Sequence, residues 1–237
     1  LFVSVPRLWL KFQLGVFKKM PRKRLAFLLK VPIIRGIIQK KILSGLGLSQ
    51  VRVAVSGSAP VPAELIEWYR SLSLNLFEGY AMSEDLAYSH LSKPGFAEAG
   101  FVGVPLDGVD VKISDTGEIL IKSPGKMFGY YKAEDLTKES LTEDGYFKTG
   151  DCGERNDKGM LKITGRVKEI FKTSKGKYIS PAPIENIINN DVHIELSCVS
   201  GLGYPQPYAQ IQLAEDIRNN LTDSKKSEVT AALQELL

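Results

Sequence analysis

The sequence predicts an α/β fold with a partial doubly wound parallel sheet, a region of short strands that forms a β-barrel or sheet, and a small, truncated α+β domain at the C-terminal end. Three observations support this prediction. Residues 51–84 alternate strand, loop, helix and strand, which is a βαβ unit. Residues 101–165 contain alternating apolar positions separated by glycine turns. A basic connector then leads into a second, shorter α+β segment.

Length and composition indicate a globular protein. The chain has 237 residues, of which 43% are hydrophobic, enough for substantial cores. Its cysteines, Cys152 and Cys198, and its histidines, His90 and His193, show no spacing typical of a disulfide framework or a zinc ribbon. We therefore expect a reducing compartment and no transition-metal site.

Charge is distributed very unevenly along the chain. Residues 1–48 contain eleven Lys or Arg and no Asp or Glu, which leaves twenty basic and twenty-seven acidic residues in the remainder. The first part thus carries +11 and the rest −7, an asymmetry that suggests an anionic surface as partner. No apolar run is long enough to span a bilayer, and the start of the chain lacks a signal-peptide pattern. The opening Leu-Phe-Val, without an initiator methionine, indicates a fragment of a longer protein.

The basic segment predicts two amphipathic helices, Arg7 to Met20 and Arg24 to Leu46, interrupted by Pro21 and Pro32. Their basic face has two interpretations. It binds a membrane surface or an anionic ligand, or it is the solvated face of helices that pack on a domain outside this sequence. The aromatic residues here follow helical spacing, which argues against nucleic acid as partner.

The βαβ unit begins with the β-branched run Val51–Val55 and ends with the strand Leu74–Phe77. Between them lie a small-residue loop and a helix over Val61–Ser71 with Pro62 in its first turn. Parallel strands place both following loops at the same edge of the sheet, where open α/β sheets bind ligands. Neither loop has the Walker-type spacing, so a nucleotide would need other groups to hold it.

The β-rich region predicts a hairpin over Val109–Ile121 that turns at Asp115-Thr116-Gly117. Thr149-Gly150-Asp151 ends a turn-rich stretch, and Asp157-Lys158-Gly159 turns into a strand over Met160–Thr164 that Gly165-Arg166 closes. A lysine-rich connector follows as far as Gly176. Beyond it we expect Ser180 as N-cap, and then these elements: helix Ala182–Asn189, strands Ile194–Ser200 and Tyr208–Leu213, and helix Lys225–Leu237.

Five residues have side chains suited to nucleotide chemistry: Tyr80, Ser83, Glu84, Asp151 and Arg166. A tyrosine at a strand end can stack on a base, a hydroxyl can donate to a phosphate oxygen, and a carboxylate can hold Mg²⁺. An aspartate can accept hydrogen bonds from a ribose diol, and an arginine can donate to ribose or phosphate oxygens. Spacing alone leaves open that the Ser-Glu pair is an ordinary helix start.

Five motifs occur in the order and character of the adenylate-forming superfamily: SGSAP, GYAMSE, GEILIKSPGKMFGYY, DGYFKTGD and GRVKEIFKTSKGKYISPAPIEN. The opening VPRLWLKFQ and the form IFKTSKGKYISP resemble its long-chain acyl-CoA synthetase branch. The resemblance covers about Val5 to Asn190. It implies ATP-dependent activation of a fatty acid, with an acyl-adenylate formed first and CoA as the second acceptor.

The resemblance also implies residue roles. The adenine site is assigned to Gly57, Ser58, Ala59, Pro60, Gly79 and Tyr80. Ser83 lies near the α-phosphate, Glu84 is the Mg²⁺ ligand, Asp151 binds ribose, and Arg166 contacts the nucleotide. Lys168 is the hinge of a mobile C-terminal domain, and the segment from Lys175 through Gly176 to Tyr178 lines the pantetheine passage. Residues 1–166 are then the end of a large adenylation domain, and residues 167–237 an incomplete C-terminal domain.

Departures from the superfamily's pattern limit this interpretation. The Ser/Thr/Gly-rich phosphate loop and the C-terminal lysine motif have no match in the sequence, and Ala81 stands where glycine is common. We therefore expect no acyl-CoA synthesis by this polypeptide alone. The alternative is a non-catalytic nucleotide-binding or membrane-peripheral regulatory module. In either case we expect a cytoplasmic location, peripheral on the inner membrane face where the basic segment binds lipid.

Overall fold

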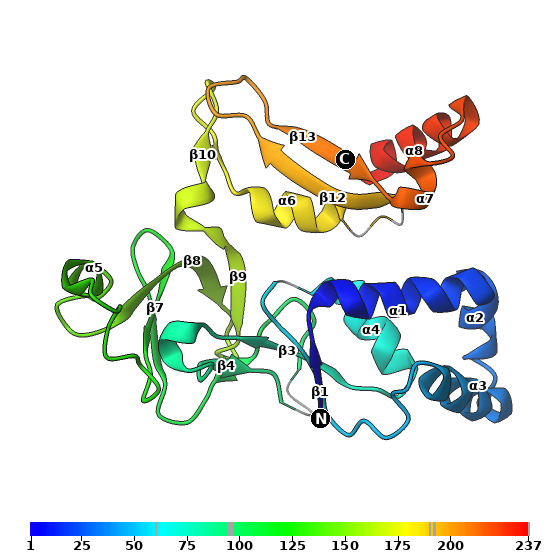
Figure 1. The fold of residues 1–237 in the computed structure, drawn as a ribbon, viewed down its shortest axis with the longest axis horizontal. Coiled ribbons are helices and arrows are strands. Elements are labelled where there is room, and N and C mark those ends of the chain that lie inside the picture. The colour runs from blue at the N-terminus through cyan, green and yellow to red at the C-terminus, as the bar shows by residue number, and fades with distance from the viewer. Residues whose placement is uncertain (60, 94–96, 190, 192, 237) are drawn as a thin grey trace. The chain divides into compact units, whose positions relative to one another are not determined.

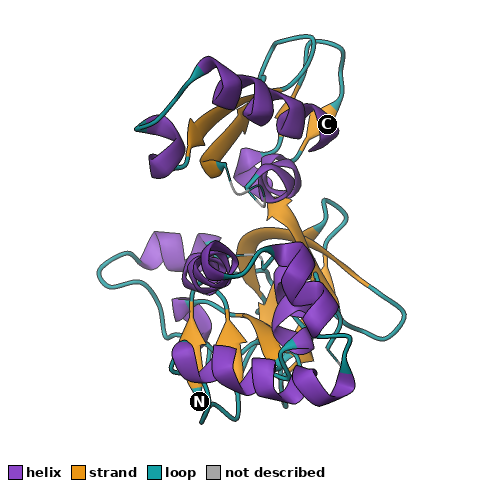
Figure 2. Ribbon diagram, turned by 90° about the vertical axis from the view of Figure 1, so that its right-hand side faces the viewer, coloured by secondary structure: helices purple, strands orange, loops and turns teal. Residues whose placement is uncertain are grey.

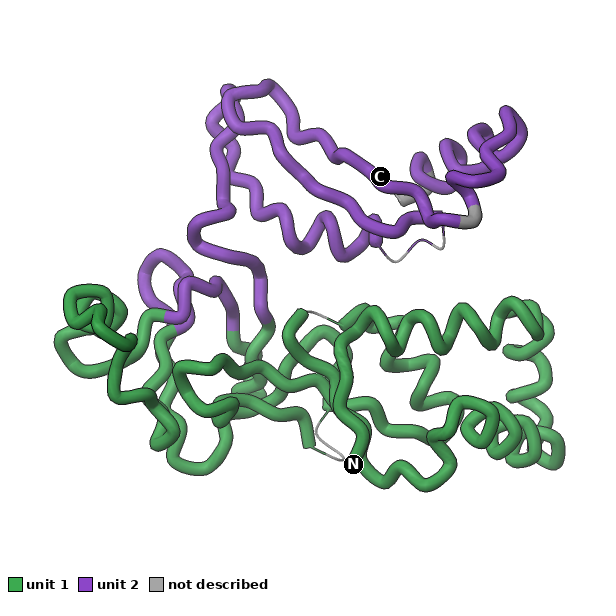
Figure 3. The backbone as a smooth tube through the Cα atoms, viewed as in Figure 1, with its two compact units in different colours: residues 1–112, 120–148, 155–162 green, residues 113–119, 149–154, 163–237 purple. Residues whose placement is uncertain are grey.

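The computed structural model describes residues 1–59, 61–93, 97–189, 191 and 193–236. It divides into two compact units (Figure 3). Unit 1 comprises Leu1–Lys112, Leu120–Lys148 and Arg155–Lys162, and unit 2 comprises Ile113–Ile119, Thr149–Glu154 and Ile163–Leu237. The expected domain boundary after residue 166 stays a prediction.

A five-stranded sheet organises unit 1 (Figure 1). The strands β1 (Phe2–Ser4), β2 (Ala54–Ser56) and β3 (Leu76–Tyr80) are parallel, with Ser4, Ser56 and Glu78 in register. The strands β4 (His90–Leu91) and β5 (Val104–Pro105) continue the sheet in antiparallel order. The βαβ prediction is confirmed, with α4 (Ala63–Ser71) as its helix.

Strand β1, which precedes the predicted helices and pairs with β2, was not predicted. A strand of three residues is too short to show a periodicity in sequence. The rest is helical: α1 (Pro6–Lys19), α2 (Arg22–Leu28) and α3 (Pro32–Gly45). Prolines mark the breaks as expected, because proline lacks an N–H and is tolerated only at or before the first helical turn.

Helices α1 and α4 pack through aromatic side chains. Trp9 and Tyr69 are fully buried, with ring centroids 5.0 Å apart at 80°. The Tyr69 hydroxyl donates to the Trp9 carbonyl oxygen at 2.7 Å, so the buried phenol is satisfied. Ala54 and Leu76 join the same core from β2 and β3. The core therefore fixes the strands whose ends carry the candidate site.

The predicted hairpin is present as β6 (Asp110–Ile113) and β7 (Glu118–Lys122). Gly117 has φ +82°, the left-handed conformation that the turn requires. The sheet order is β6-β7-β8-β9, with its strands divided between the two units. Thr149–Asp151, at the end of the turn-rich stretch, lie inside β8 (Phe147–Arg155), which the sequence did not predict and which lies beside β9 (Leu161–Arg166). The short helix α5 (Glu134–Glu139) precedes β8.

The lysine-rich connector contains short elements that the sequence did not predict. It forms η2 (Val167–Glu169) and a hairpin of β10 (Phe171–Lys172) with β11 (Tyr178–Ile179). Ser180 precedes α6 (Pro181–Ile188) as expected, but its hydroxyl donates to the Thr164 carbonyl oxygen at 2.8 Å instead of capping the helix.

The remainder of unit 2 follows the predicted order. The antiparallel strands β12 (Ile194–Ser200) and β13 (Tyr208–Leu213) have the predicted bounds, and helices lie beside them (Figure 2). The core contains Ile188, Ile194 and Val199. The helices α7 (Glu215–Arg218) and α8 (Asp223–Leu236) complete the unit, and Leu237 of the predicted last helix lies outside the described residues. Among the described helices, none combines the length and apolar character needed to cross a bilayer.

Candidate functional site

The loop after β2 approaches strand β3 through two glycines, Gly57 in the loop and Gly79 in the strand. A Cβ on Gly57 would lie 3.1 Å from the Gly79 carbonyl oxygen, and one on Gly79 would lie 3.3 Å from Cδ1 of Leu91. Both are tighter than ordinary packing, so small residues let these two backbones approach. Ser58 follows with φ +67°, a conformation that L-residues rarely adopt, and Ala59 continues the loop. Pro60 lies outside the described residues.

Tyr80 ends β3 opposite His90 of β4. Their rings are 5.9 Å apart and inclined at 52°, and Tyr80 is partly exposed. Ala81 and Met82 then lead into the turn η1 (Ser83–Asp85), in which Ser83 is exposed. The strand end thus presents an aromatic side chain next to a turn that bears a hydroxyl and a carboxylate.

Glu84 is held at two points by the segment that follows β7. Its Oε1 accepts a hydrogen bond from the Tyr130 hydroxyl at 2.9 Å, and its carbonyl oxygen accepts one from Met127 N–H at 2.7 Å. Burial and the bond to Glu84 raise the pKa of Tyr130, so the phenol stays a donor. A Cβ on Gly125 would collide with the Asp85 carbonyl oxygen, so only glycine fits this approach. The carboxylate of Glu84 is therefore positioned rather than mobile.

Two buried titratable groups support the site from within the sheet. Glu78 is 4% exposed, and burial raises its pKa to about 7 although its Oε1 accepts a hydrogen bond from Val61 N–H at 2.8 Å. His90 is 3% exposed, and burial, with a smaller effect from Arg155, lowers its pKa to about 4. The second oxygen of Glu78 and Nε2 of His90 have no hydrogen-bond partner among the described residues.

These two residues were missed by sequence reasoning. The only available signal was a charged residue, Glu78, directly after the predicted strand Leu74–Phe77 and directly before Gly79. A carboxylate placed in a buried strand indicates a fixed internal partner, here the backbone N–H of Val61. Its burial could not be read from the sequence.

Asp151 and Arg166 lie on neighbouring strands of unit 2 and form an ion pair. The distance from Arg166 Nε to Asp151 Oδ1 is 2.8 Å, and the Asp151 side chain is 12% exposed while that of Arg166 is 59% exposed. The Asp151 N–H donates to the Thr149 hydroxyl at 3.1 Å, which fixes the backbone that carries the carboxylate. The two predicted nucleotide contacts are thus brought together within one sheet.

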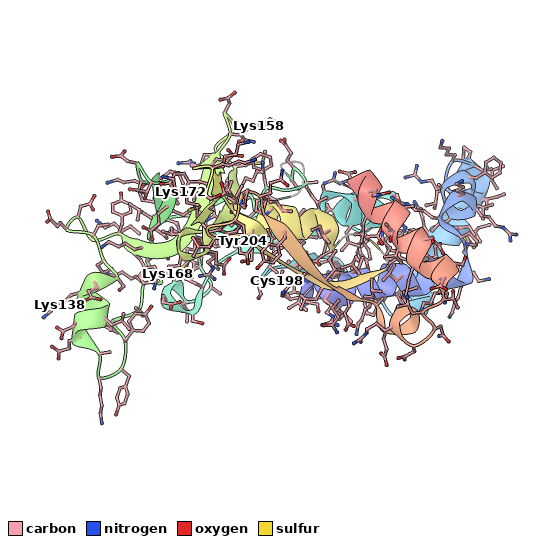
Figure 4. All side chains as sticks on the ribbon, turned by 90° about the horizontal axis from the view of Figure 1, so that it is seen from above. Lys138, Lys158, Lys168, Lys172, Cys198 and Tyr204 are labelled. Carbon is pink, nitrogen blue, oxygen red and sulfur yellow. The ribbon has the colours of Figure 1, made fainter. Side chains whose placement is uncertain are left out.

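The three remaining predicted residues also belong to unit 2. Lys168 is exposed in η2 (Figure 4). Lys175 and Gly176 lie in the β10–β11 turn, where Gly176 has φ +81° and donates its N–H to Thr173 O at 2.9 Å. The predicted residues therefore form one group around η1 in unit 1 and others within unit 2. In the described part of the chain, no three His, Cys, Asp or Glu residues cluster as a metal site.

A family model described as AMP-binding enzyme matches residues 1–131, more than half of the chain. The chain belongs to the AMP-binding enzyme family. This confirms the resemblance drawn from the five motifs, since the matched range includes SGSAP, GYAMSE and GEILIKSPGKMFGYY.

Curated relatives of this AMP-binding enzyme chain are fatty acid–CoA ligases. Long-chain-fatty-acid–CoA ligase FadD15 of Mycobacterium bovis is 38% identical over 74% of this chain and 29% of its own length. Long-chain-fatty-acid–CoA ligase 1 of Homo sapiens is 39% identical over 64% of this chain and 23% of its own. Fatty acyl-CoA synthetase B of Dictyostelium discoideum is 31% identical over 85% of this chain and 35% of its own length. The chain thus spans about a quarter to a third of the relatives' length.

Solved structures agree on the fold. The adenylation domain of a Mycobacterium chelonae carboxylate reductase aligns with 99% of this chain and 38% of that chain at a TM-score of 0.72 and 20% identity. The Bacillus subtilis O-succinylbenzoate coenzyme A synthetase, in complex with ATP and magnesium ion, aligns with 76% of this chain and 42% of its own at a TM-score of 0.63 and 26% identity. The mixed fold, with a partly parallel sheet and antiparallel sheets, is that of part of an adenylation domain.

Proposed function

We propose that this chain is part of an ATP-dependent long-chain fatty acid–CoA ligase. The observation that supports it most is the arrangement at the ends of β2 and β3, where Gly57 packs on Gly79, Tyr80 follows, and Glu84 is fixed by Tyr130. This arrangement occurs in a chain whose relatives bear the name long-chain-fatty-acid–CoA ligase. An aromatic ring, a hydroxyl and an oriented carboxylate in that order suit adenine, phosphate and a hydrated cation.

In unit 1 we assign the adenine contact to Tyr80 and to the loop of Gly57, Ser58, Ala59 and Pro60, with Gly79 allowing close approach. Ser83 donates to the α-phosphate. Glu84 holds Mg²⁺, and the fit is chemically reasonable because this cation prefers oxygen ligands and shares them with phosphates and water. When bound, Mg²⁺ supplies charge neutralisation at the phosphates.

In unit 2 we assign ribose binding to Asp151 and a nucleotide contact to Arg166. Their mutual ion pair orients both groups, so each can add hydrogen bonds to ribose or phosphate oxygens without a large rearrangement. Lys168 is assigned as the hinge about which residues 167–237 rotate. Lys175 and Gly176 are assigned to the passage for the pantetheine arm of CoA.

In the proposed reaction, a fatty acid carboxylate oxygen attacks the α-phosphorus of ATP, the bond to the β,γ-unit breaks, and pyrophosphate leaves. The CoA thiolate then attacks the acyl carbonyl carbon and AMP leaves with the electron pair of the broken C–O bond. Both steps depend on positioning and on stabilising negative charge. Residues such as Tyr80 and Ser83 would supply the positioning.

We further propose that the 237-residue chain alone does not complete this reaction, because its sequence contains neither the phosphate loop nor the C-terminal lysine motif. Fatty acid-dependent exchange of labelled pyrophosphate into ATP should be absent for this chain, and clear exchange would contradict the proposal. Binding of a fluorescent ATP analogue should weaken in Tyr80→Ala and not in Tyr131→Ala, an exposed control. Equal binding by both variants would contradict the adenine assignment.

A non-catalytic nucleotide-binding module is the alternative. It predicts that a longer gene product containing this chain binds ATP but shows no pyrophosphate exchange.

We also propose an anionic membrane surface as partner of residues 1–48, because this segment contains eleven basic residues and no acidic one. Such a protein would be peripheral on the cytoplasmic face of a membrane.

A further inference from the structure

Helix α3 presents isoleucines to solvent. None of its fourteen residues is buried, and Ile33 and Ile37 are 85% and 65% exposed. At about 100° per residue, these two share one side of the helix with Lys40. The opposite side faces the protein, because Gln39 Nε2 donates to the Ser71 carbonyl oxygen at 2.9 Å. The outward face of α3 is therefore apolar with a basic border.

Helix α2 extends this surface. Phe27 is 67% exposed, and Lys23 and Arg24 beside it are exposed as well. Exposed phenylalanine and isoleucine among basic residues, without any acidic residue, is the composition of helices that lie in a membrane interface. An anionic bilayer surface attracts the basic residues while the apolar side chains enter the headgroup and acyl boundary.

A cavity of about 370 Å³ lies next to these helices, within unit 1. Its lining is mainly apolar, including Phe17, Leu25, Leu29 and Trp68, and its basic residues are Arg22, Lys30 and Arg35. Arg22 pairs with Glu64 at 3.2 Å, whereas Lys30 and Arg35 form no ion pair among the described residues. An apolar cavity with cationic groups fits an amphiphile that has an acyl chain and an anionic head.

We propose that residues 22–41, the α2–α3 corner, lie in the interface of a bilayer that contains anionic phospholipid. Phe27, Ile33 and Ile37 insert among the lipids, and one lipid places its phosphate at Lys30 and Arg35 with part of an acyl chain in the cavity. This inference rests on the proposed anionic membrane partner of residues 1–48 and is independent of the ligase reaction. A second copy of the chain is disfavoured on this face, because a two-fold contact would oppose two basic surfaces that lack acidic residues.

Co-sedimentation of the 237-residue chain with vesicles tests the surface. We expect binding to phosphatidylcholine vesicles that contain phosphatidylglycerol, little binding to pure phosphatidylcholine, and weakening by salt. Lys40→Gln with Lys41→Gln should weaken binding by about fivefold per lysine, and Ile33→Ser with Ile37→Ser by about tenfold or more. The matched control is Leu136→Ser with Lys138→Gln on α5 (Figure 4), where both side chains are exposed, and it should bind like the wild type.

The outcomes separate this inference from the broader partner proposal. Loss of binding in the lysine variant but not in the isoleucine variant would leave an anionic surface as partner and overturn the insertion of α3. Equal binding to the two vesicle types, or no binding to either, would overturn both the anionic membrane partner and the insertion of α3. Reversible self-association without vesicles that Ile33→Ser with Ile37→Ser abolishes would show a second copy on this face and overturn the proposal.

Two further measurements test the cavity and a covering segment. Lipid with a brominated acyl chain should quench the fluorescence of Trp68, one of two tryptophans, and the quenching should disappear in Trp68→Phe. Quenching that persists in Trp68→Phe, or no quenching in a bound sample, would overturn lipid entry into the cavity.

Ile33→Cys in any longer polypeptide that includes this chain should react with a maleimide and become protected by anionic vesicles. Protection without vesicles would show that another segment covers the face.

Discussion

Replacing Glu78 by glutamine should stabilise the fold at neutral and higher pH and should leave stability at low pH nearly unchanged. Glu78 is buried, and its pKa is raised from 4.5 to about 7 by burial. Glutamine has nearly the same shape and keeps an oxygen to accept the hydrogen bond from Val61 N–H. The variant therefore removes the carboxylate charge and little else.

The sign and the size follow from proton binding. Between about pH 4.5 and pH 7 the folded state retains the Glu78 proton that the unfolded state has released, so the free energy of unfolding falls as pH rises through this window. A shift of this size corresponds to about 3 kcal/mol, reached above pH 7. His90 has the opposite effect, because its lowered pKa makes stability rise as pH increases from about 4 to 6.5. In the wild type, the contributions of Glu78 and His90 to the pH dependence of the unfolding free energy therefore have opposite signs.

The assay is therefore a difference measurement. Urea unfolding of wild type and Glu78→Gln at several pH values between 4 and 8 gives the change in unfolding free energy, in which the contribution of His90 cancels. We expect a difference near zero at pH 4 that grows to about 3 kcal/mol in favour of the variant at pH 8. Glu143→Gln, at an exposed position, is the control and should show no such growth. A constant difference across this range would refute the reasoning.

Two other substitutions test how Glu84 is held. Tyr130→Phe removes the 2.9 Å hydrogen bond to Glu84 and should lower the free energy of unfolding by about 1 kcal/mol. It should also weaken Mg²⁺-dependent ATP binding. Unchanged ATP binding would show that Tyr130 does not contribute to the site. Gly125→Ala forces a methyl group against the Asp85 carbonyl oxygen and should destabilise by about 1–3 kcal/mol in urea unfolding. Its control is Gly15→Ala, in α1, where the methyl group meets nothing within 4 Å and should stabilise by about 0.5–1 kcal/mol. Equal effects of the two alanines would contradict a steric cause.

The fold was predictable where local pattern and tertiary structure agree. The strands β12 and β13 have the predicted bounds, because apolar residues alternate along them and turn residues flank them. Strand β8 was missed at Thr149–Asp151, since these residue types favour turns, and Gly150 has a φ of +72° even within the strand. Only pairing with both neighbouring strands includes these residues in the sheet. Strand β1 was missed because a three-residue strand depends on its partner β2.

The candidate site was predictable as residue types but not as environments. The motif GYAMSE identifies Tyr80 and Glu84, while the bond from Tyr130, forty-six positions away, depends on the path of the chain. The same holds for Asp151, which the sequence places at the end of a turn-rich stretch and the structure places in a strand beside Arg166.

Glu78 and Glu84 show why environment decides the role of a residue type. They are six positions apart in one strand-and-turn segment, yet Glu78 is buried against a backbone N–H while Glu84 is partly exposed and bonded to a phenol. Burial disfavours the charged form, so Glu78 suits a structural link between β3 and the segment at Val61. A cation needs a carboxylate that retains contact with solvent and phosphate, which only Glu84 of the two provides. The exchange Glu84→Gln should therefore abolish the Mg²⁺ dependence of ATP binding, whereas Glu78→Gln should preserve it.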